Sequence, residues 1–108
     1  MALIIKKVSV TVAAAQTDSV VVAAVTGKRL RVTAVFSLCG ATATSLVFNS
    51  KPAGAGTAIS PVFTPAVNAG IILPPNTAGW FDTASGEGLT VTTGAGTSTG
   101  LIVQYAEI

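Results

Sequence analysis

The segment Gly79–Ile108, GWFDTASGEGLTVTTGAGTSTGLIVQYAEI, decides the fold class. Leu89 and Val91 alternate with threonines, and an apolar or aromatic residue recurs at every second position from 101 to 105. This period of two places alternate side chains on opposite faces of a strand. Small, glycine-rich connections separate the runs, because glycine tolerates the positive φ of a tight turn. The segment therefore predicts a short strand at Trp80-Phe81 and two longer strands, arranged as a meander.

The rest of the chain supplies further runs of strand length with turn residues between them. They cover residues 4–12, 20–25, 28–39, 44–50, 57–63 and 69–73. Pro61 restricts the run 57–63 to an edge strand, since proline has no N–H for a ladder. No segment has a helical period long enough to predict a helix. We therefore expect an all-β fold, an antiparallel β-sandwich of about eight strands, with a jelly roll as the specific prediction.

Two of the runs carry expectations about burial. The run 28–39 alternates without a break and should place one set of residues on a single face: Leu30, Val32, Ala34, Phe36 and Leu38. Val20–Val25 is almost continuous in β-branched residues and alanine, which suits a strand covered on both faces. The chain 1–108 is short enough to form one β-sandwich domain, in which residues 1–7 are a candidate extended N-terminal arm.

Charge is scarce in this chain. Half of the 108 residues are apolar and 9% are charged, whereas about 25% is usual for a globular domain. Six basic and four acidic side chains are too few to keep the apolar patches of a soluble monomer small. Much of the surface is therefore expected to contact other protein, in a homo-oligomer or with another partner.

Two apolar stretches are poor candidates for membrane insertion. Val32–Ser50 is free of charge, but Gly40 interrupts it and hydroxyl and β-branched side chains are frequent within it. Near the N-terminus, Lys6 and Lys7 follow the apolar residues 3–5, which is the reverse of the order in a signal peptide. We expect no membrane partner and synthesis inside the cell.

Residues that commonly perform catalysis or bind metals are few. The chain has no histidine, and its one cysteine, Cys39, is expected to pack inside an apolar strand. Asp82 and Glu87 flank a glycine turn, where acids are favoured because they remain solvated. The glycine-rich loop 94–100 lacks the lysine of a phosphate-binding loop, and no helix follows it. We predict no catalytic residue, no metal site and no cofactor.

The candidate interface combines aromatic and basic side chains. Large aromatic residues among small neighbours are usually core or interface anchors. The basic cluster at 28–31 is more typical of a solvated edge or an intersubunit ion pair than of a phosphate track, so a nucleic acid partner is not expected. The predicted interface residues are Trp80, Phe81, Tyr105, Arg29 and Arg31.

A family resemblance is carried by Pro75, by Gly79–Leu89 (GWFDTASGEGL) and by Tyr105–Ile108 (YAEI), with a looser match at Val22–Val32 (VAAVTGKRLRV). These residues resemble small proteins encoded by tailed bacteriophages, which are similar to single jelly-roll virion components. The resemblance implies a head decoration or cement protein that is made in the host cytoplasm, assembles as a trimer in the virion and contacts the major capsid protein or another virion protein. It carries over no functional residues.

A second hypothesis comes from a different class of function. Exposed aromatics and loops would also suit a tail or receptor-binding module that recognises host surface glycans. An enzyme is the least favoured class, because the lack of histidine and the scarcity of acids remove most common mechanisms.

Overall fold

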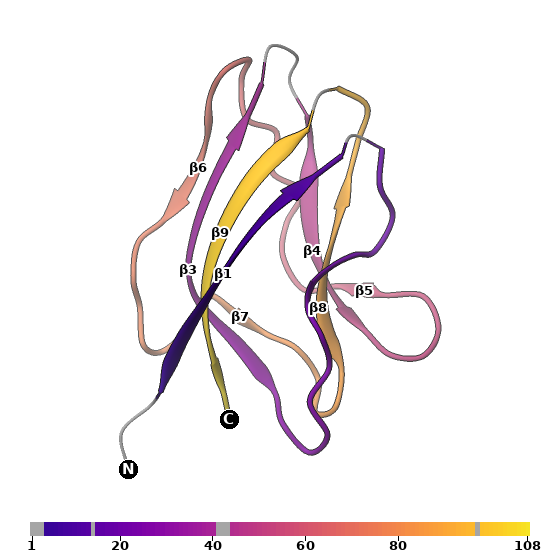
Figure 1. Cartoon of the computed structure of the whole chain (residues 1–108), viewed down its shortest axis with the longest axis vertical. Helices are drawn as coiled ribbons and strands as arrows, with labels where there is room; N and C mark the ends of the chain where they lie inside the picture. Colours follow the sequence, from indigo (N-terminus) through magenta and orange to yellow (C-terminus); the bar gives the residue numbers. More distant parts are fainter. Residues whose placement is uncertain (1–3, 14, 41–43, 97) are drawn as a thin grey trace.

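The computed structural model describes residues 4–13, 15–40, 44–96 and 98–108, and its described strands form two antiparallel sheets (Figure 1). Sheet A contains β1 (Ile5–Val12), β9 (Thr99–Glu107), β3 (Leu30–Cys39) and β6 (Gly70–Leu73) in that order, and the short β7 (Phe81–Asp82) also pairs with β3. Sheet B contains β2 (Ser19–Val22), β8 (Gly88–Thr93), β4 (Leu46–Lys51) and β5 (Thr57–Ala58). The two sheets face each other as a sandwich, which confirms the predicted fold class.

The strand order is that of a jelly roll. Strand β1 pairs with β9, β2 with β8, β3 with β6 and β4 with β5. These pairs are nested along the sequence, with the ends of the chain in the outermost pair and the middle of the chain in the innermost pair. Successive pairs alternate between sheets A and B. This is the pattern of a long hairpin wrapped into two Greek keys. The pairing of β1 with β9 also brings the described ends of the chain to the same end of the sandwich (Figure 1).

The predicted meander at the end of the chain is wrong. Strand β8 lies in sheet B, whereas β7 and β9 lie in sheet A, so none of the three pairs with another. The connections after β7 and β8 cross from one sheet to the other instead of turning back as hairpins. The period of two fixes which side chains share a face of a strand, but it does not specify the neighbouring strand.

The core lies between the two sheets and is made of aliphatic side chains and one phenylalanine. Its completely buried members include Leu30, Val32 and Val103 from sheet A, and Phe48 and Leu89 from sheet B. Burying a side chain of this size stabilises the folded state by about 1.5–3 kcal/mol relative to leaving it exposed. In β4, Leu46 and Phe48 are both buried in the core.

The predicted single face of β3 is wrong from residue 34 onward. The register with β9 shifts between Val32 and Ala34, which places a β-bulge at Thr33. A bulge adds one residue to a strand and reverses the alternation beyond it. Leu30 and Val32 therefore point into the core, whereas Phe36, beyond the bulge, is 46% exposed.

Strand β2 departs from its prediction in length and burial. The predicted run reached Val25, but the strand ends at Val22 and forms the edge of sheet B. Val20 is 58% exposed, so the strand is not covered on both faces. An edge position leaves one side of the strand without a partner, and the alanines that follow bury too little to extend it. In the candidate arm 1–7, Ile5 to Lys7 belong to β1 and pair with β9.

Candidate interaction surface

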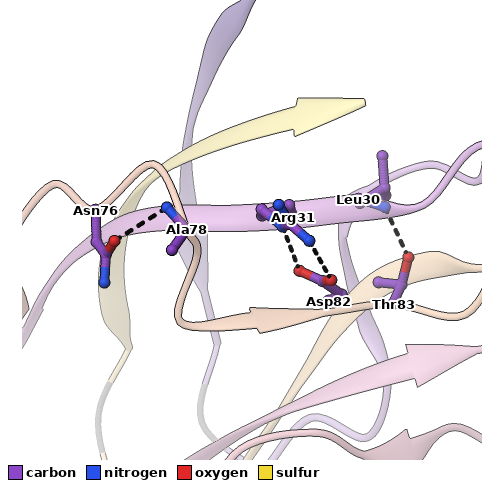
Figure 2. Close-up of polar contacts among 6 residues, drawn as sticks. All are labelled: Leu30, Arg31, Asn76, Ala78, Asp82 and Thr83. Carbon is purple, nitrogen blue, oxygen red and sulfur yellow. Dashed lines mark hydrogen bonds and ion pairs between the residues drawn. The ribbon is translucent and has the colours of Figure 1, made fainter. Parts of the chain in front are cut away.

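A bidentate ion pair in sheet A joins β3 to β7 (Figure 2). Arg31 donates from Nε to Asp82 Oδ1 and from Nη2 to Asp82 Oδ2, both at 3.0 Å. The two residues are register partners in the sheet, so their side chains lie on the same side of it. These hydrogen bonds raise the pKa of Arg31, with the charge of Asp82 as a further cause. The guanidinium is held in a bidentate geometry that binds its carboxylate partner directionally.

The turn at residues 76–79, before β7, leaves space for the ion pair between Arg31 and Asp82. The Asn76 side chain accepts a hydrogen bond from Ala78 N at 3.0 Å (Figure 2). Gly79 N donates to Asn76 O at 2.8 Å. Gly79 has φ of +85°, and a Cβ added to it would lie 2.5 Å from Arg31 Cγ. Only glycine leaves the space through which the Arg31 side chain passes toward Asp82.

The three predicted aromatic residues have different environments. Trp80 is 41% exposed, and its Nε1 donates to Pro74 O at 2.8 Å, which fixes the ring direction. Phe81 points the other way and packs on Phe48, with ring centroids 5.2 Å apart. Tyr105 is partly buried against the core. The Trp80 ring therefore remains partly exposed, while Phe81 and Tyr105 contribute to packing.

The basic residues are also separated. Arg29 is exposed, and its backbone exchanges hydrogen bonds with Ile108. Arg31 is neutralised by Asp82. At the same end of sheet A, Lys6 donates to Glu107 Oε2 at 2.8 Å, and this hydrogen bond raises the pKa of Lys6. The structure thus brings acids to two of the chain's basic side chains and forms no row of unpaired cations from 28–31.

The acids and the cysteine are engaged in structural contacts. Glu87 accepts a 2.6 Å hydrogen bond from Ser50 Oγ, whereas Asp82 binds Arg31, so the two carboxylates face different partners. The buried Cys39 Sγ lies 3.0 Å from the carbonyl oxygens of Ala66 and Ala69. Among the described residues, no three side chains of the metal-binding types lie close enough together to hold an ion.

The outer side of sheet A carries a patch that the sequence analysis did not find. Phe36 on β3 lies opposite Ile72 on β6 and Ile102 on β9, and Leu38 occupies the next outward position of β3. Ile72 is 68% exposed and the other three are 45% to 50% exposed. We call these four residues the apolar face. The outward direction of Phe36 and Leu38 follows from the bulge at Thr33, for which the sequence gives no local signal.

Part of the outer side of sheet B carries a hydrogen-bonded set of polar residues, whereas Val20 at the edge of the sheet is exposed. Asp18 accepts hydrogen bonds from Thr90 Oγ1 at 3.0 Å and Gly56 N at 3.1 Å, and its own N–H donates to Thr92 Oγ1 at 3.1 Å. Asn49 Nδ2 also donates to Thr92 Oγ1, at 3.0 Å. We call these five residues the polar network. It ties β2, β8, β4 and the loop before β5 together, so the two outer sides of the sandwich differ in chemistry.

Comparisons with known proteins give a match in fold only. No family model and no curated protein matches the chain. The chain is similar to the solved structure of Bacillus endospore appendages, which form a family of disulfide-linked pili. The two chains share 20% sequence identity with a TM-score of 0.54, and the match covers 97% of this chain and 86% of that chain. A virus-like particle structure of the extra small virus of the giant freshwater prawn Macrobrachium rosenbergii has 12% identity and a TM-score of 0.27, covering 97% and 80%. The first similarity indicates a shared overall fold. The described residues include no helix long and apolar enough to cross a membrane.

Proposed function

We propose that this protein is a structural component of a tailed-bacteriophage virion, a head decoration or cement protein that acts through protein–protein contacts. The observation that carries the proposal is the apolar face, which a jelly roll with 9% charged residues leaves open to water. Exposed apolar patches on soluble proteins mark contact surfaces. The resemblance of residues 79–89 and 105–108 to phage proteins is the reason for proposing a phage virion as the particle to which the protein binds.

The proposal extends to assembly and location. The subunit forms a closed homotrimer, a number taken from the phage resemblance, and binds the major capsid protein or another virion protein after synthesis in the host cytoplasm. Closed symmetry is favoured because a head-to-tail contact that does not close would grow into a fibre. This structural role needs neither catalysis nor a cofactor, and Asp82 and Glu87 both make hydrogen bonds within the chain.

The spore-appendage subunits provide a useful contrast. Those appendages are disulfide-linked pili. The only cysteine of this chain, Cys39, is 3% exposed and lies against two backbone carbonyls. Linkage of copies through Cys39 would require the strand to open, so the proposed assembly is non-covalent.

Purified particles test the virion role. We expect the chain in mature heads, and we expect heads that lack its gene product to lose genome at lower temperature and after milder osmotic shock. Adding back the purified protein should restore resistance. Absence of the chain from mature heads, or unchanged resistance without it, would contradict the cement role.

A second candidate function rests on Trp80. Its ring is 41% exposed and held in one direction by the bond to Pro74 O, an arrangement that could stack on a sugar. A receptor-binding tail module would bind host glycans on an array, and Trp80→Ala would abolish binding while leaving particle association intact. The absence of binding to any glycan by the wild-type protein would remove this candidate.

A further inference from the structure

We propose that the second half of β3 is a register switch, in which the bulge at Thr33 moves to the end of the strand and the apolar residues beyond it turn into the core. The first half of the strand is fixed, because Arg31 is held by Asp82 of β7. The second half, from Ala34 to Cys39, pairs with β9 and β6. The inference goes beyond the proposed function and does not depend on it, because it concerns the subunit by itself.

The sequence of β3 and its observed register place different residues in the core. Alternation from Leu30 onward predicts a wholly apolar inner face. The bulge instead buries four side chains, three of which carry a polar group, and leaves two large apolar ones about half exposed. The buried side chains are Thr33, Val35, Ser37 and Cys39, and the exposed ones are Phe36 and Leu38. Conflicts between local pattern and final structure are typical of functional segments.

The observed register leaves a buried hydroxyl group unpaired at the bulge. Thr33 is 2% exposed, and its Oγ1 has no hydrogen-bond partner among the described residues. A buried polar group without a partner lowers stability, because it has lost its hydrogen bonds to water. Without the bulge, Thr33 would alternate with the inward Val32 and face outward, where water binds its hydroxyl. The unpaired group therefore favours the second register.

Hydrogen bonds with the segment that contains β6 favour the observed register. Asn76 N donates to Thr33 O at 2.9 Å, and Ile71 N donates to Ser37 Oγ at 3.2 Å. The Cys39 thiol lies 3.0 Å from two carbonyl oxygens of the same segment. The observed register thus has more hydrogen bonds along β3, whereas the second register has a more apolar core. These opposing terms allow one strand to have two registers.

The second register fits between the neighbouring strands. If β9 and β6 stay in place and β3 moves by one residue, Phe36 takes the position of Ser37, opposite inward residues of both neighbours. Leu38 takes the position of Cys39 in the same way. Together with Ala34, these two larger side chains replace four smaller ones, so the summed volume of the inward side chains changes little. Protein cores tolerate apolar exchanges that conserve volume.

The switch changes the outer surface of sheet A. In the second register, two of the four residues of the apolar face are buried, and Val35, Ser37 and Cys39 face outward. The extra residue of the bulge passes to the connection at Gly40, which follows the strand and tolerates unusual dihedral angles. Any molecule that binds the apolar face therefore selects the observed register. A free subunit hides most of this face whenever it occupies the second register.

Reaction of the native Cys39 with Ellman's reagent tests the switch. The thiol is 3% exposed in the observed register and faces outward in the second. At about 1 μM, where self-association is weakest, we expect labelling that depends little on low concentrations of urea. Switching exposes little new surface, whereas global unfolding depends steeply on urea.

Two matched serine variants separate the switch from other openings. Phe36→Ser should lower the labelling rate constant about tenfold or more, because the phenylalanine is completely buried only in the second register. The control is Ile102→Ser, since Ile102 lies opposite Phe36 and is 45% exposed against 46%. Ile102 faces outward in both registers, so its replacement should leave the rate constant unchanged. Circular dichroism should report the same folded spectrum for both variants.

Two further measurements do not depend on these variants. Deletion of Thr33 removes the extra residue, so β3 keeps its observed faces without a bulge and Cys39 should react only through global unfolding. In the wild type, hydrogen exchange should show the amides of residues 34–39 opening together in one sub-global step. The amides of residues 30–32 should exchange only on global unfolding, because this half of the strand does not move.

The outcomes are decisive for the switch and leave the virion role to its own test. Labelling of wild-type Cys39 at only the rate and urea dependence of global unfolding would overturn the switch. Equal or faster labelling of Phe36→Ser would show that the end of β3 frays, and would overturn it as well. Neither result changes the expected presence of the chain in mature heads, which is measured on particles.

Discussion

At Gly79 the backbone of one segment and the side chain of a neighbouring strand need the same space. The residue has φ of +85°, and the Arg31 side chain passes 2.5 Å from where a Cβ would stand. Glycine therefore serves two purposes, a left-handed turn and a passage for the guanidinium. The bidentate contact with Asp82 depends on both.

Gly79→Ala should lower the free energy of unfolding by more than an alanine substitution at another glycine with positive φ. The matched control is Gly86→Ala, because Gly86 also has positive φ, +77°, but a Cβ there would meet nothing within 4 Å. We expect a loss of about 1–2 kcal/mol for the control from backbone strain. Overpacking against Arg31 should add about 1–3 kcal/mol for Gly79→Ala. Urea unfolding measures both, and equal losses would show that the Arg31 side chain adjusts freely.

For single residues, the contacts that the structure shows differ from those that the sequence predicted. Trp80 and Phe81 were expected together at an interface, but neighbours in a strand point to opposite sides, and Phe81 faces Phe48 in the core. The basic cluster at 28–31 was expected at a solvated edge or in an intersubunit ion pair, but within the chain Arg31 binds Asp82, and Lys6 binds Glu107. These partners are distant in sequence, so a local pattern could not identify them.

At the scale of elements, Asp18 organises the outer side of sheet B. Its carboxylate binds Thr90 and the backbone of Gly56, and its backbone has φ of +50°. Asp18→Ala should remove both contacts and cost about 1–3 kcal/mol, the usual penalty for leaving such groups unpaired. Asp18→Asn is the matched variant, because asparagine keeps an acceptor and tolerates positive φ.

Chemical denaturation of these two variants measures the role of the polar network. We expect Asp18→Asn to lose less than half of what Asp18→Ala loses. Equal stability of Asp18→Ala and the wild type would mean that water replaces the network without cost, and that the two outer sides of the sandwich do not differ energetically.

Strand β3 shows where prediction from periodicity ends. The pattern located the strand within two residues of its true start and correctly placed Leu30 and Val32 in the core. It failed at the bulge, where Thr33 O accepts a hydrogen bond from Asn76 N at 2.9 Å. That partner comes from a loop far along the chain, so the reversal of the faces is decided by tertiary structure. The apolar face is a direct consequence of this reversal.

For the whole molecule, the all-β sandwich was predictable and a jelly roll was the specific prediction, but the sheet to which each strand belongs was not predictable. Apolar residues on nearly every strand required two layers, whatever the order of the strands. The assignment of β7, β8 and β9 to different sheets depends on which distant edges they meet. Turn residues such as Gly86 permit a hairpin and a crossing between sheets equally well.

The central claim for the whole molecule is that this jelly roll is stable as part of an assembly, with its apolar surface covered by protein. If dissociation and unfolding are coupled, the melting temperature must depend on protein concentration by mass action. For a trimer, a hundredfold rise in concentration should raise the melting temperature by about 5 to 10 °C.

Differential scanning calorimetry across that concentration range, with the mass determined by sedimentation in the same samples, is the most direct test. We predict a single transition that moves to higher temperature with concentration, from a sample with an oligomeric mass. A monodisperse sample with the mass of one chain, and a melting temperature that does not change with concentration, would contradict the account.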